Sequence, residues 1–166
     1  MIFFIIFIGV IILSNQNRKR KVKVGSRRKG RELCVQALYQ YAISNQDIDY
    51  LKGLKWAEGS KKPSGAAIKY FIELFDGTLE HLEEVEPYIK EFAPKYDQIM
   101  PIDHAVLRFS TYSLIFERDI PAVIIINEAI EITKTFGGVN AHKFINGVLD
   151  GIRKKLVEKG KRMEKE

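Results

Sequence analysis

The sequence has few of the residues on which catalysis, metal binding or disulfide formation depends. Its single cysteine, Cys34, excludes a disulfide within the chain and suits a reducing compartment. Its three histidines, His81, His104 and His142, are scattered, and none pairs with a cysteine at metal-ligand spacing. Neither glycine-rich phosphate-binding motif, G-x-x-x-x-G-K-[ST] or G-x-G-x-x-G, occurs. These absences predict a binding protein without catalysis, metal or cofactor, and Cys34, set among helix formers, is expected to pack as a small core hydrophobe.

Long apolar runs are absent apart from the first 13 residues, MIFFIIFIGVIIL. A membrane-spanning helix needs about 20 residues. The segment is no ordinary secretory signal, because its positive charge follows the apolar run and no A-x-A-like site is present. Two interpretations stay open. One is a membrane-anchored helical adaptor whose basic segment lies on anionic lipid. The other, which we favour, is an upstream translation outside the working protein, so that residues 1–24 lie outside the fold of a cytoplasmic protein.

Positive charge is concentrated in one stretch, NRKRKVKVGSRRKGR, which carries nine Lys or Arg between Asn17 and Arg31. The remaining 18 Lys and Arg face 21 Asp and Glu, so the rest of the chain has a net charge of −3 although the whole chain has +6. Such a local basic block is typical of a contact with phosphates or lipid headgroups, although a solvated tail is the plainer interpretation.

Hydrophobic spacing predicts an all-α protein of six to seven helices with no convincing strand. We place the helices at 26–44, 48–56, 63–81, 82–92, 101 to a stop at 119–121, 121–136 and 140–159. Ser64 or Pro63 is expected to begin the third helix, Pro87 to lie near a break, and Asn140 to cap the last helix. The folded domain should span 25–159, and the charged end 160–166 should be frayed and solvated.

Two surfaces of this predicted bundle suit RNA. In the first helix, a spacing of about 100° per residue places Arg28, Arg31, Val35 and Tyr39 opposite the apolar face, which would offer cations beside a base-stacking aromatic ring. The second surface is the turn FGGVNAHKF, from Phe136 to Phe144, which joins a helix N-terminus to Lys143 and two aromatic residues. Tyr39 and Phe144 could equally be ordinary packing residues of the core.

Four blocks of sequence, RRKGRELCVQALYQ, IDHAVLRFSTYSLIFERDIP, INEAIEITKTFGG and HKFINGVLDGIRKK, resemble the bacterial NusB family of transcription antitermination factors in order and spacing. The resemblance covers roughly 25–156 and implies two packed helical subdomains. It implies binding of boxA-type single-stranded RNA together with the ribosomal protein NusE. It also implies association with other Nus factors and elongating RNA polymerase in support of ribosomal RNA transcription. The free protein would be a monomer or a homodimer.

The resemblance also assigns residues. RNA-binding positions fall on Arg27, Arg28, Lys29, Arg31, Tyr39, Phe136, Gly137, Asn140, Lys143 and Phe144. Partner-binding acids fall on Asp97 and Asp103, where the alignment is loose. Gly30 departs from the family by placing a poor helix former inside the arginine motif, so we expect an irregular start there. A related domain precedes RNA cytosine methyltransferases, but this chain has no room for a catalytic domain.

Overall fold

The computed structural model describes residues 25–57 and 62–163. Within these ranges the chain is all-helical and contains no strand, which confirms the predicted fold class. The helices are α2 (Ser26–Ser44), α3 (Ile48–Lys52), α4 (Gly65–Glu80), α5 (Leu82–Phe92), the 3-10 helix η1 (Tyr96–Gln98), α6 (Pro101–Phe116), α7 (Ala122–Phe136) and α8 (Ala141–Glu158). The apolar N-terminal segment and most of the basic run lie outside the described residues. None of the described helices combines the length and apolar composition that a membrane span requires.

Local chemistry accounts for some of the helix ends. Ser64 begins α4 as predicted, because its side chain accepts a hydrogen bond from the backbone N–H of Ala67 at 3.2 Å. Asn140 is the N-cap residue of α8 as predicted, but it takes a left-handed conformation (φ 64°) and its side chain accepts no capping hydrogen bond. The expected break at Pro87 is wrong. Pro87 lies inside α5 on its exposed side, so water can reach the carbonyl that lacks a helical partner.

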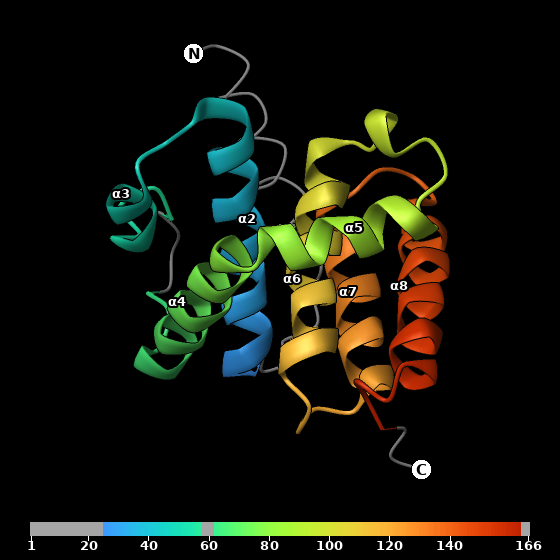
Figure 1. Ribbon diagram of the computed structural model, residues 1–166. Coiled ribbons are helices and arrows are strands. Elements are labelled where there is room, and N and C mark those ends of the chain that lie inside the picture. The colour runs from blue at the N-terminus through green and yellow to red at the C-terminus, as the bar shows by residue number, and fades with distance from the viewer. Residues whose placement is uncertain (1–24, 58–61, 164–166) are drawn as a thin grey trace.

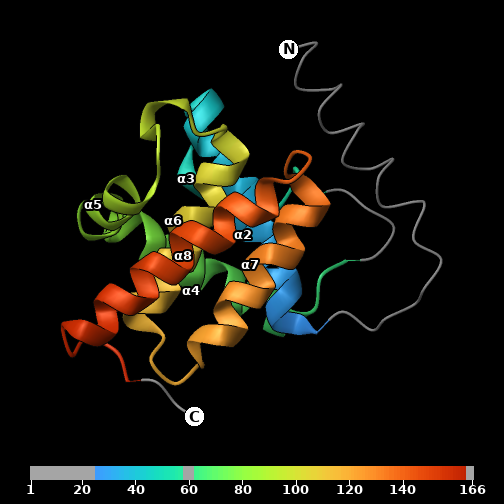
Figure 2. The ribbon, with the colours of Figure 1, turned by 90° about the vertical axis from the view of Figure 1, so that its right-hand side faces the viewer.

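The helices form two groups that share one core. In Figure 1, α2, α6, α7 and α8 run alongside one another, while α4 crosses α2 and α5 crosses the front of α6–α8. Figure 2 shows α7 and α8 as neighbours on the adjacent side of the molecule. The groups α2–α4 and α5–α8 meet mainly where α2 and α4 pack on α6. One hydrophobic cluster extends through both groups, with Phe71, Phe75 and Phe109 among its largest fully buried side chains.

Gly30 is a packing residue and not an irregularity. It lies inside regular helix α2 and is buried. A Cβ at this position would be 2.8 Å from Cδ1 of Tyr70 and 3.0 Å from the backbone oxygen of Ala67. The irregular start expected at Gly30 is therefore wrong, because the absent side chain lets α2 and α4 approach closely.

The C-terminal segment after α8 is anchored, contrary to the expectation of a frayed end. Arg162 is only 4% exposed. Its guanidinium donates to the backbone oxygen of Leu114 at 2.6 Å and to that of Ile120. These carbonyls lie at the end of α6 and in the turn that follows, where helical partners are absent. The segment thus closes the α6–α7 end of the bundle, although 164–166 lie beyond the described residues.

Candidate nucleic-acid interface

The basic start of α2 presents its four cations in different ways. Arg27 is exposed, and its guanidinium carbon lies 5.8 Å from the centre of the Tyr70 ring. Lys29 is half-exposed and its Nζ lies 3.3 Å from a carboxylate oxygen of Glu32, one turn along the helix. An exposed pair of this kind is weak and exchanges readily for another anion. Arg27 and Lys29 therefore remain available to phosphates.

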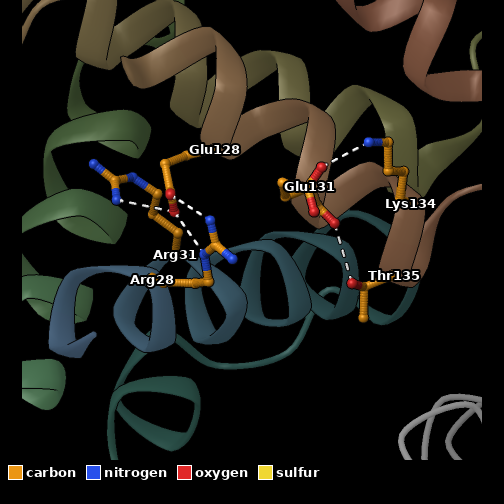
Figure 3. A network of polar contacts seen from close by, with 6 residues as sticks. All are labelled: Arg28, Arg31, Glu128, Glu131, Lys134 and Thr135. Atoms are coloured by element: carbon orange, nitrogen blue, oxygen red, sulfur yellow. Dashed lines mark hydrogen bonds and ion pairs between the residues drawn. The ribbon is translucent and has the colours of Figure 1, made fainter. Parts of the chain in front are cut away.

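Arg28 forms a forked ion pair with a helix far away in the sequence. Its Nε donates to Oε2 of Glu128 at 3.0 Å and its Nη2 donates to Oε1 at 2.6 Å. Figure 3 shows the Glu128 side chain descending from α7 between the guanidinium groups of Arg28 and Arg31. The hydrogen bond with Glu128 raises the pKa of Arg28, and burial opposes that shift. Arg28 is 35% exposed at its side chain, so part of the guanidinium still faces solvent.

Arg31 is a buried link between helices. It is 3% exposed, its Nη1 lies 3.5 Å from Oε2 of Glu128, and its guanidinium lies 5.2 Å from the Tyr70 ring centre. The Tyr70 hydroxyl donates to Glu117 at 3.1 Å, and burial raises the pKa of Tyr70. Arg31 thus joins α2 to α4 and α7, and it supports the surface from beneath.

Helical spacing predicted one exposed face on α2, and this prediction is wrong. Val35, which was placed on it, is fully buried, and Tyr39 is half-buried and packs against the core. The reason is that α2 contacts α4, α6 and α7, so that the core surrounds it on more than one side.

Cys34 is buried as predicted, and burial raises the pKa of its thiol well above the ordinary value.

The α7–α8 turn contributes the second predicted surface. Asn140 and Lys143 are exposed there, whereas Phe136 is 8% exposed and Phe144 is half-buried against the core. Val139, which sequence analysis did not single out, is 96% exposed at the tip of the turn. The polar and small residues of this turn can meet a ligand, while its two aromatic residues mainly hold the turn in place.

The two predicted surfaces are connected through α7. Glu128 contacts the start of α2, and Phe136 ends α7 eight residues later, which is about 12 Å along a helix. Lys134 lies between them, pairs with Glu131 at 2.6 Å and is 41% exposed at its side chain (Figure 3). Sequence analysis missed both Glu128 and Lys134.

The two predicted partner-facing acids differ in exposure. Asp97 in η1 is exposed. Asp103 is 7% exposed, and its Oδ1 accepts no hydrogen bond from the described residues. A Cβ on Gly137 would lie 2.8 Å from that oxygen, so Asp103 packs against the α7–α8 turn. Burial raises the pKa of Asp103. Asp103, in α6, therefore packs beneath the α7–α8 turn. Of the two acids, only Asp97 is exposed to a partner.

Glu86 organises a polar network beside η1. Its carboxylate accepts hydrogen bonds from the Tyr96 hydroxyl and Arg108, and His104 Nε2 lies 3.0 Å away. Burial alone would raise the pKa of Glu86, but these hydrogen bonds outweigh it and lower the pKa to about 2. Glu86 therefore fixes the loop that carries Asp97. Across the described ranges, no group of His, Cys, Asp and Glu could hold a metal ion.

Comparisons with known proteins identify the family. The model of the NusB family matches residues 28–154. A curated relative from Actinobacillus succinogenes, transcription antitermination protein NusB, is 44% identical over 142 residues, which are 85% of this chain and 99% of the relative. The protein of the same name from Shewanella woodyi is 40% identical over 132 residues, or 79% and 97% of the two chains. These names agree with the prediction of a protein that is not an enzyme.

Solved structures give the same answer for the fold. The NusB of T. maritima has a TM-score of 0.70 and 32% identity, and the match covers 84% of this chain and 98% of that one. A crystal structure of the antitermination factors NusB and NusE in complex with double-stranded RNA has a TM-score of 0.68 at 23% identity, with 78% and 97% covered. The second likeness supports the all-helical fold alone. Since a family model covers most of the chain and relatives match over nearly their whole length, the chain belongs to the NusB family.

Proposed function

We propose that this protein is an RNA-binding transcription antitermination factor. In this role it binds boxA-type single-stranded RNA together with ribosomal protein NusE, and the complex joins other Nus factors on elongating RNA polymerase to support ribosomal RNA transcription. The observation that carries the proposal is the 44% identity to a transcription antitermination protein over 99% of that relative. A solved structure of the same fold holds NusB and NusE with double-stranded RNA, and the proposal extends this pairing of partners to the present chain.

The exposed cations give the proposal a physical basis. Arg27, the outer part of Arg28 and Lys29 lie at the start of α2, and Lys143 lies at the start of α8. Phosphates attract such cations in a salt-dependent manner. We assign direct RNA contacts to these four residues together with Asn140, Gly137 and Tyr39. Arg31 and Phe136 support the surface by packing, because they are buried, and Phe144 holds the turn by its contact with the core. Asp97 is assigned to the basic partner, whose charge an exposed acid suits.

Fluorescence-anisotropy binding of the full chain tests this function. The ligands are a boxA-type single-stranded RNA and a scrambled RNA of equal length, each with and without NusE over a salt series. We expect preference for the boxA-type RNA, a gain with NusE, and a log–log salt slope of about −0.7 per phosphate contact. Equal, weak binding of both RNAs that NusE does not improve would refute the proposal.

Matched variants localise the surface. Arg27→Ala should lower affinity for both RNAs and reduce the salt slope by about 0.7, because it removes one phosphate contact. Lys154→Ala is the control, since it removes the same charge from an exposed position on α8. Tyr39→Ala should weaken binding of both RNAs without changing the salt slope, because stacking on a ring is tolerant of sequence and involves no phosphate. Because Tyr39 also packs on the core, the unfolding midpoint of the Tyr39→Ala variant must be measured as well.

A further inference from the structure

Glu128 occupies a position that the family assignment leaves unexplained. It is an acidic residue in the middle of α7, 17% exposed at its side chain, and it contacts two arginines of the predicted RNA-binding motif. An acid beside an RNA surface repels phosphates unless it serves the cations around it. Here the carboxylate contacts Arg28 at 2.6 and 3.0 Å and Arg31 at 3.5 Å (Figure 3).

The atoms engaged by Glu128 determine which edge of Arg28 stays open. The carboxylate takes the Nε and Nη2 side of the guanidinium. A guanidinium is a planar fork of five N–H donors, so the outer edge, formed by Nη1 and the second hydrogen of Nη2, remains for another acceptor. That edge suits two oxygens of a phosphate. We propose that Glu128 is a positioning residue that holds Arg28 with this outer edge directed at a phosphate of the bound RNA.

The carboxylate itself is held from behind. Arg31 is buried, stacks over Tyr70 and reaches the same oxygen of Glu128 that Arg28 Nε uses. A carboxylate between a buried arginine and a half-exposed one has little freedom to turn. Arg28 therefore meets RNA with its long side chain already ordered, and binding does not have to supply that order.

The charge balance favours positioning over inhibition. Two arginines share one carboxylate, so the three side chains keep a net charge of +1. The carboxylate is shared between the buried Arg31 and the half-exposed Arg28, so the cluster keeps one positive charge in excess. A carboxylate that only competed with RNA would need no second arginine behind it.

The test is a double-mutant cycle on RNA affinity that uses the full chain. Glu128→Asp keeps the charge but withdraws the carboxylate by one methylene, so it should weaken binding of the boxA-type RNA about three- to tenfold, the effect of leaving one long side chain to be ordered by the ligand. In an Arg28→Ala background the same change should have no further effect. Arg28→Lys keeps the charge without the fork, so it should weaken binding and be insensitive to Glu128→Asp.

The inference rests on the proposed RNA binding, and the cycle separates the two. If wild-type protein does not prefer the boxA-type RNA, the proposed function fails and the inference falls with it. If wild type binds but Glu128→Asp binds equally well, the positioning role alone is refuted. Tighter binding by Glu128→Asp would mean that the carboxylate restrains Arg28 from RNA. Equal weakening with Arg28 present or absent would mean that Glu128 acts through the fold, which thermal unfolding of each variant monitors independently.

Discussion

Replacing Gly30 by alanine should destabilise the protein, although alanine is the better helix former. Gly30 lies inside α2 where α4 crosses it. An added Cβ would meet Tyr70 Cδ1 at 2.8 Å, the Ala67 oxygen at 3.0 Å and the Phe71 nitrogen at 3.2 Å. Two of these atoms belong to the α4 backbone, so relief requires the helices to separate.

The magnitude follows from two opposing contributions. Alanine gains about 1 kcal/mol over glycine inside a helix. Forcing an additional methyl group into a packed interface costs about 1–3 kcal/mol. With a cost near the middle of that range, Gly30→Ala should lower the free energy of unfolding by about 1 kcal/mol, and the melting temperature should fall by about 3 °C in a protein of this size.

Gly147→Ala supplies the matched control. Gly147 lies inside α8, is exposed, and an added Cβ would meet nothing within 4 Å. Only the helix-propensity gain applies there, so this variant should be more stable than wild type by about 1 kcal/mol. Urea and thermal unfolding of the two variants measure a predicted difference of about 2 kcal/mol. If Gly30→Ala is as stabilising as Gly147→Ala, the close approach of α2 and α4 does not constrain this position.

Three further predictions concern buried polar groups. Arg31→Ala should lower the free energy of unfolding by about 3 kcal/mol in urea titrations, because it breaks a buried ion pair. Lys29→Ala, at a half-exposed pair, should cost under about 1 kcal/mol. Equal effects of the two variants would contradict the buried role of Arg31. Glu86, with its pKa lowered from 4.5 to about 2, should contribute stability that is present above pH 4.5 and lost as pH falls toward 2. The stability gap between wild type and Glu86→Gln should therefore shrink over that range, and a constant gap would argue against the network. Arg162→Ala should cost about 2 kcal/mol by leaving buried carbonyls unpaired, while exposed Lys161→Ala should be neutral in the same melting experiment.

Helix positions could be predicted from the sequence because their signals are local. The apolar spacing and end residues located 26–44 and 82–92 without error, and the start at Pro101 and the end at Phe136 agree with α6 and α7. Errors arose where a helix boundary depends on more than its own residues. Pro87 is tolerated because it faces water, and the end of α8 is followed by a segment that Arg162 fixes to a distant turn.

The arrangement of the candidate surface depended on contacts that spacing along one helix cannot reveal. A single apolar stripe defines one buried side, but α2 is enclosed by α4, α6 and α7, so Val35 and Arg31 are buried opposite the predicted stripe. The partner that decides the role of Arg28 lies 100 residues away in the chain. Sequence reasoning could single out the cations as a group, but it could not say which of them face solvent.

Helix α7 connects the two sequence motifs, the basic start of α2 and the α7–α8 turn. Through Glu128 it fixes the orientation of Arg28 at the start of α2, and through its end at Phe136 it sets the turn that presents Asn140 and Lys143. Glu128 and Phe136 are about 12 Å apart along the axis of α7, with Lys134 between them in the sequence. An extended strand of a few nucleotides covers such a distance. A ligand that contacts both motifs therefore reads the spacing fixed by α7, and changes inside this helix should alter recognition even where they touch no ligand.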